Sequence, residues 1–135
     1  MNRILLSTAV LALFTAALHT FGGTPGIEAP LLQAGLAPEI SLLLLACWHL
    51  VTVALSVSAI ALFISASPKH AVQSHYMALF ISFMWIGFGL VFILVSIVYS
   101  GVPMLLKLPQ WILLIPIGLL GLWGCSRLRV LPSTH

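Results

Sequence analysis

The sequence predicts an all-α membrane protein, a four-transmembrane-helix bundle that forms a single domain over residues 1–135. Of the 135 residues, 61% are hydrophobic and only 5% are charged, whereas about a quarter of the residues of a soluble domain are charged. Mean hydropathy is +1.22, and the apolar residues gather in long runs. Because a helix needs about 20 apolar residues to cross a bilayer, this length allows about four crossings.

The predicted helices follow the apolar runs, because lipid offers no partner for backbone N–H and C=O groups and a helix pairs them internally. The predicted spans are about 4–21, 41–66, 76–100 and 111–125. Glycine and proline interrupt helices, so Gly22-Gly23-Thr24-Pro25-Gly26 is expected to end the first span. Ser67-Pro68-Lys69 should end the second and Gly101-Val102-Pro103 the third. Pro116 lies inside the fourth and is expected to kink it.

The first span has two interpretations. A basic start at Arg3, an apolar run and the small residues Thr15 and Ala17 are compatible with a cleaved signal peptide. The apolar run is longer than a usual signal-peptide core of about 7–15 residues, and cleavage would leave an odd number of spans. We therefore expect the first span to be retained, with 22–39 as the longest connection. Within that connection a short helix is expected from Pro30 to Gly35.

Basic residues predict the orientation. Four of the five fall on one side of the predicted membrane and Lys107 on the other, the four being Arg3, Lys69, Arg127 and Arg129. The positive-inside rule then places both termini and the 67–75 loop in the cytoplasm, with Glu28 and Glu39 in the outer loop. The basic residues form no run, so nucleic-acid binding is not expected. We expect a multi-pass protein of a bacterial inner membrane, in contact with membrane lipid.

Small and weakly polar residues mark the expected packing faces, because the hydrophobic effect does not hold helices together in lipid. Residues three or four apart share one helical face, and each predicted span carries one such set. The sets are Thr8, Ala12, Thr15 and His19; His49, Thr52, Ser56 and Ala59; Ser82, Gly89 and Ser96; and Gly118, Gly121, Gly124 and Cys125. Cys47 and Cys125 should lie at different depths, so no disulfide is expected.

His19 and His49 are the candidate site residues, because an ionisable group within a membrane span is costly and is often functional. If the inner end of the second span is fixed near Ala66, the two histidines lie at similar depths. They could then hold a transition metal, zinc, iron or copper, with Glu28 or Glu39 as a further ligand. A b-type haem between the two imidazoles is an alternative, although no outer arginine is available for the propionates.

Other roles for these histidines remain open. They could form a proton relay, or a ligand pocket with Trp48, Thr52 and Thr15. They could also bond a neighbouring threonine or carbonyl and serve packing alone. His70 and His75, which flank the start of the third span, are expected to be solvated loop residues.

Three motifs occur in order along the chain: His19-Thr20-Phe21-Gly22-Gly23, Cys47-Trp48-His49-Leu50-Val51-Thr52 and Pro109-Gln110-Trp111. In this combination the sequence resembles a group of small four-span bacterial inner-membrane proteins, and the likeness covers nearly the whole chain. The resemblance implies a four-helix fold and an inner-membrane location. It implies no activity.

The sequence also lacks several motifs of known chemistry. The first span has no carboxylate of the kind that small multidrug exporters need, and the chain has no phosphate-binding loop, Gly-x-Ser-x-Gly or His-Glu-x-x-His. We expect a non-enzymatic protein, structural or accessory to a larger complex, active as a homodimer, or binding a lipid-soluble ligand. The alternative is a haem- or metal-binding redox or transport protein that uses His19 and His49. A membrane enzyme with His49 as acid–base is a third hypothesis.

Overall fold

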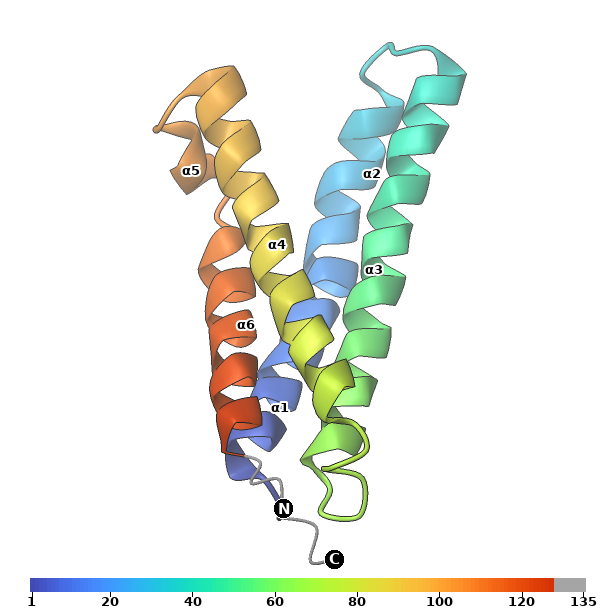
Figure 1. Ribbon diagram of the computed structural model, residues 1–135. Helices are drawn as coiled ribbons and strands as arrows, with labels where there is room; N and C mark the ends of the chain where they lie inside the picture. Colours follow the sequence, from blue (N-terminus) through green and yellow to red (C-terminus); the bar gives the residue numbers. More distant parts are fainter. Residues whose placement is uncertain (128–135) are drawn as a thin grey trace, which may run out of the picture.

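The structure, a computed structural model, describes residues 1–127, and within them the chain is helical without β-strands (Figure 1). A first helical stretch consists of α1 (Arg3–Ala17), the π-helix η1 (Leu18–Gly23) and α2 (Thr24–Leu32). It is followed by α3 (Pro38–Ala66), α4 (His75–Ser100), the short α5 (Met104–Lys107) and α6 (Trp111–Ser126). Arg129, which contributed to the predicted orientation, lies outside the described residues.

Three helical stretches of residues 1–127 are long and apolar enough to cross a membrane. They are Arg3–Leu32, Pro38–Ala66 and His75–Ser100, with 30, 29 and 26 residues. The fourth apolar helix, α6, has 16 residues, about 24 Å at the rise of an α-helix. The helices expected over 41–66, 76–100 and 111–125 are therefore confirmed as helices, and their ends agree to within three residues.

The predicted end of the first span was wrong. The chain stays helical through Gly22–Gly26 and ends at Leu32, so Pro30 lies inside α2 and does not open a separate helix. The local reason is the π-turn at Leu18–Gly23. Proline normally clashes with the carbonyl four residues before it, and a wider π-turn just before Pro25 changes this spacing. Pro25 lies in the first turn of α2, directly after this π-turn.

Within residues 1–127 the helices form two antiparallel pairs, α1 with α3 and α4 with α6, and α1 also packs along α6. The pairs meet at the end of the bundle that holds the N-terminus and diverge toward the other end (Figure 1). Asn2 joins three helices at the closed end. Its backbone N–H donates to the Ala66 carbonyl at 3.0 Å, and its side-chain Nδ2 donates to the Gly124 carbonyl at 2.8 Å. Its Oδ1 also caps α1 by accepting from Ile4 and Leu5.

Small residues lie at the helix contacts, as the sequence predicted for three of the four sets. The predicted residues of α4 and α6 are all buried, and on α1 Thr8, Ala12 and Thr15 are buried while His19 is half-buried. A Cβ added at Gly118 would lie 2.6 Å from the Ser82 carbonyl oxygen, and one at Gly124 would lie 2.8 Å from Leu5. These glycines therefore allow α6 to approach both α4 and α1 closely.

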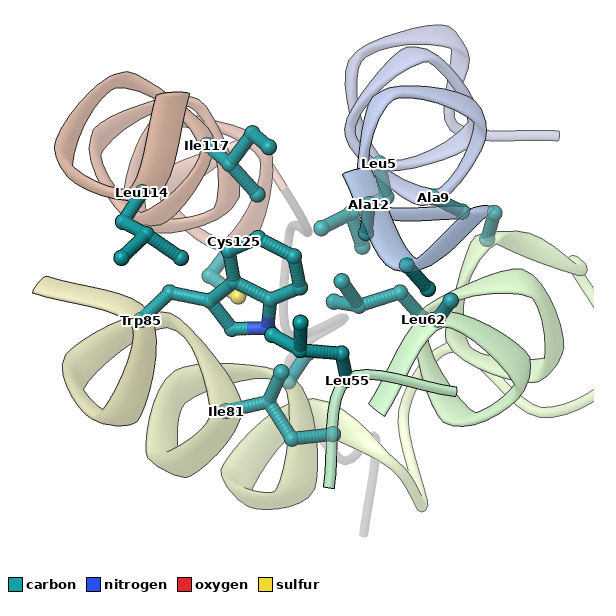
Figure 2. Close-up of a cluster of buried hydrophobic side chains, with 14 residues drawn as sticks. Leu5, Ala9, Ala12, Leu55, Leu62, Ile81, Trp85, Leu114, Ile117 and Cys125 are labelled. Carbon is teal, nitrogen blue, oxygen red and sulfur yellow. The ribbon is translucent and has the colours of Figure 1, made fainter. Parts of the chain in front are cut away.

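The face predicted for α3 was wrong in its outer half. His49 is exposed and Thr52 is half-buried, whereas the buried face of α3 carries Leu55, Ser58, Ala59, Leu62, Ser65 and Ala66. Large apolar residues take part in this contact, so the positions of the small and polar residues alone did not identify the buried face of α3. The core that results is centred on the fully buried Trp85 of α4. Figure 2 shows its ring among Leu55 and Leu62 of α3 and Leu114 and Ile117 of α6.

Candidate functional site

A partly open cavity of about 540 Å³ lies between the α1–α3 pair and the α4–α6 pair. This volume is within the range of about 300–1,000 Å³ that is usual for small-molecule sites. The cavity is bounded by the end of α1 and η1, the middle of α3, the second half of α4 and the start of α6. The lining residues are Thr15, Leu18, His19, Gly23, Trp48, Val51, Leu55, Phe88, Val91, Phe92, Gln110, Leu113 and Leu114.

The walls of the cavity are mostly apolar. Among the described residues, no charged side chain lines it, and the lining side chains with polar atoms are those of Thr15, His19, Trp48 and Gln110. A few polar groups in an apolar wall are typical of a site that orients an apolar ligand. An ion would find no opposite charge here, and burying one without a partner is strongly unfavourable.

His19 and Trp48 form one unit in the wall. Their rings are stacked, with centroids 3.9 Å apart and an interplanar angle of 19°. The indole Nε1 of Trp48 donates to Thr24 Oγ1 at 3.0 Å, which fixes the far side of the ring. Gly23 makes room for it, because a Cβ there would lie 2.7 Å from Trp48 Cζ2. The π-turn of η1 therefore supplies both His19 and Gly23 to the indole of α3.

The backbone of Trp48 also indicates which ring nitrogen of His19 donates. Nε2 of His19 lies 3.2 Å from the Trp48 carbonyl oxygen. A carbonyl oxygen only accepts, so Nε2 carries the hydrogen of this bond. The same carbonyl accepts from Thr52 Oγ1 at 3.3 Å. Thr52 thus supports Trp48 through its backbone, but it does not line the cavity.

Gln110 forms the opposite part of the wall, at the start of α6. Its side-chain oxygen Oε1 is buried and has no hydrogen-bond partner among the described residues. A buried, unpaired amide oxygen is costly, by about 1–3 kcal/mol, and native structures contain few of them. Ser96 Oγ of α4 and His75 Nδ1 are also buried and unpaired in this part of the chain, but they do not line the cavity.

The structure brings together some of the predicted site residues and separates others. Thr15, His19 and Trp48 line the cavity, whereas His49 is exposed on α3 and does not. His49 follows Trp48 in the helix, so its side chain points about 100° away around the axis. Glu28 in α2 and Glu39 at the start of α3 are exposed. Within residues 1–127, no three His, Cys, Asp or Glu side chains form a group that could hold a metal ion.

Sequence reasoning missed Gln110 and the aromatic residues of α4. Gln110 was part of a recognised motif, Pro109-Gln110-Trp111, and it is an uncharged polar residue directly before an apolar span. A polar residue at that position is the feature of the sequence that could have identified Gln110 as a site residue. Phe88 and Phe92 could not be predicted as cavity residues, because a phenylalanine in a membrane span has the same hydropathy whether it faces lipid or a cavity. Both Cys47 and Cys125 are free thiols, Cys47 exposed and Cys125 buried.

Comparisons of the chain with protein-family models, with curated proteins and with solved structures gave no match.

Proposed function

We propose that this protein is a four-span protein of a bacterial inner membrane that binds an apolar, lipid-soluble molecule between its helix pairs. The observation that carries the proposal is the cavity itself, about 540 Å³ in volume and lined by apolar side chains. In this proposal the protein holds its ligand without changing it. A role as an accessory subunit of a larger complex, or as a homodimer, stays a prediction.

The distribution of charge supports a topology with both termini in the cytoplasm. Arg3 begins α1, Lys69 follows α3 and Arg127 caps α6, so all three lie at the closed end of the bundle. Lys107, in α5, lies at the other end. By the positive-inside rule, the closed end then faces the cytoplasm. Measurement of the side on which reporter fusions at Lys69 and Lys107 are active tests this topology.

The place of the cavity supports a ligand that comes from the lipid. His19 is about 24 Å along the helix from Arg3, so the polar residues of the cavity lie toward the outer face of a hydrocarbon core about 30 Å thick. The cavity extends from there toward the core around Trp85. Because α3 and α4 have few contacts with each other, an apolar molecule can reach the cavity from the bilayer between them.

Analysis of co-purified lipids tests the proposal. The protein is purified from bacterial membranes in mild detergent, extracted with organic solvent and examined by mass spectrometry. We expect one apolar compound at close to one molecule per chain, in excess of its share of the membrane lipid. Val91 lines the cavity, so Val91→Trp fills part of it and should remove this compound.

Val95→Trp is the matched control, because Val95 is also exposed on α4, one helical turn away, and does not line the cavity. This variant should keep the compound. If the wild type, Val91→Trp and Val95→Trp carry the same mixture of bulk lipids in the same amounts, the cavity is not a binding site and the proposal is wrong.

A further inference from the structure

We infer that the ligand is a neutral apolar molecule with a hydroxyl group, and that this hydroxyl donates its hydrogen bond to the His19 imidazole. The inference rests on the proposed function and names the class of ligand that the site would take. It follows from the positions of the polar atoms in the cavity wall and from which of them already have partners.

His19 lies in η1 and Gln110 at the start of α6, and both residues line the cavity. The helix pairs that carry them diverge toward this end of the bundle (Figure 1).

The His19 imidazole offers the ligand an acceptor. Nε2 uses its hydrogen on the Trp48 carbonyl. In a neutral imidazole the other nitrogen, Nδ1, then carries a lone pair and no hydrogen. No residue in the described part of the chain bonds Nδ1. The stack on Trp48 holds the ring in its plane, so this acceptor has a fixed direction.

Thr15 also offers an acceptor, whereas Oε1 of Gln110 is fully buried, so a ligand in the cavity does not contact it. Thr15 donates its hydroxyl hydrogen to the Leu11 carbonyl at 2.9 Å, which leaves only lone pairs for a ligand. The indole N–H of Trp48 already donates to Thr24. His19 and Thr15 therefore offer acceptors, and a ligand that carries a donor can pair with them.

The rest of the wall sets the other properties of the ligand. No lining residue among those described carries a charge, so a carboxylate or phosphate head has no counter-ion and a neutral head is favoured. Away from His19 the wall includes Leu55, Phe88 and Leu114, which suit an apolar body. Membrane quinols and aliphatic lipid alcohols both have this chemistry.

Matched probes test the inference. Purified protein in phosphatidylcholine nanodiscs is titrated with radiolabelled para-decylphenol, and empty nanodiscs give the background from partitioning. Decylbenzene, para-decylanisole and para-decylbenzoate compete with it, and they offer respectively no hydrogen bond, an acceptor alone and a charge. We expect the phenol to bind about tenfold more tightly than decylbenzene or the anisole, as one buried hydrogen bond provides. Hexadecanol as a further competitor separates an aliphatic from an aromatic alcohol.

One variant locates the hydrogen bond. His19→Phe removes the acceptor and retains an aromatic ring for the stack, and it should reduce the preference for the phenol. Gln33→Leu is the control, because Gln33 is exposed at the end of α2 and outside the cavity. It should leave the preference unchanged.

The outcomes separate the inference from the proposed function. If no probe binds above the background of empty nanodiscs, both are wrong. If decylbenzene binds as tightly as the phenol, the cavity is a binding site but the hydroxyl is not recognised. Stronger binding of the anisole or the benzoate would also overturn the inference. A preference for the phenol that survives His19→Phe would contradict the assigned residue.

Discussion

The indole Nε1 of Trp85 donates a hydrogen bond to Ser58 Oγ at 2.9 Å, and both residues are buried. Ser58 Oγ in turn donates a hydrogen bond to the Leu55 carbonyl, also at 2.9 Å. The bond joins α4 to α3, two helices with few other contacts. It lies about one helical turn below Phe88 and Leu55, which line the cavity. A polar contact between the helix pairs therefore closes the inner end of the site.

We expect the bond between Trp85 and Ser58 to stabilise the bundle. In a double-mutant cycle with Ser58→Ala and Trp85→Phe, the coupling energy should be about 1 kcal/mol, within the range for interhelical hydrogen bonds in membranes. The measurement is the free energy of unfolding in a mixed-micelle titration with SDS. Ser56→Ala is the control, because Ser56 is half-buried on the same helix and makes no side-chain hydrogen bond in the described residues. Additive effects of the two substitutions would contradict the prediction.

Substitution by alanine should have different effects on stability at two glycines of the α4–α6 pair. At Gly118 a Cβ would lie 2.6 Å from the Ser82 carbonyl oxygen and 2.5 Å from Ile86 Cγ1, so the helices must move apart. Gly118→Ala should lower the free energy of unfolding by about 1–3 kcal/mol, the usual cost of overpacking. At Gly87 a Cβ meets nothing within 4 Å in the described structure, and Gly87→Ala should not destabilise. Thermal unfolding of the two variants in one detergent compares them, and equal melting temperatures would refute the close approach of α4 and α6.

Neighbouring glycines in η1 give a test of the site. Gly23→Ala would push the Trp48 ring, because the new Cβ would lie 2.7 Å from Cζ2, and should break its stack with His19. Gly22→Ala meets nothing within 4 Å among the described residues and should raise helix stability by about 0.5 kcal/mol. Tryptophan fluorescence of each variant, with Trp48→Phe as reference, reports the environment of the indole. An unchanged Trp48 contribution in Gly23→Ala would show that the ring does not pack on Gly23.

Asn2 has two roles that one substitution separates. Asn2→Asp keeps an oxygen to cap Ile4 and Leu5 but removes the donor to the Gly124 carbonyl. Asn2→Ala removes both. If the bond to Gly124 stabilises the closed end, Asn2→Asp should lose about 1 kcal/mol and Asn2→Ala about 1 kcal/mol more for the cap. Unfolding by SDS measures both. A wild-type midpoint for Asn2→Asp would assign the whole effect to the cap.

The sequence predicted the parts of the fold that depend on residue size. Gly118, Gly121 and Gly124 are buried because only small residues let the α6 backbone approach its neighbours. The sequence shows this requirement in the regular spacing of the three glycines. The continuation of the first helix through Pro25 was not predictable in this way. Glycine and proline favour a turn locally, whereas the π-turn packs against Trp48, a residue of another helix that lies 25 positions after Gly23.

The candidate site was predicted in part for a similar reason. Thr15, His19 and Trp48 are polar or large residues within apolar runs, and they line the cavity. His49 looked equivalent to His19, but the face of α3 that packs inward is set by Leu55 and Leu62. Apolar residues that contact protein and those that contact lipid have the same hydropathy. The rotation of α3, and hence the exposure of His49, therefore required the structure.

The hydrogen bond from Asn2 to the Gly124 carbonyl joins residues 122 positions apart in the chain. During synthesis, α1 enters the membrane long before α6 has been made. The closed end of the bundle, and the floor that it provides for the cavity, can therefore form only after α6 has been synthesised. Until then Asn2 lacks its partner on α6. Truncation within α6 would leave a membrane-inserted chain that is unable to close.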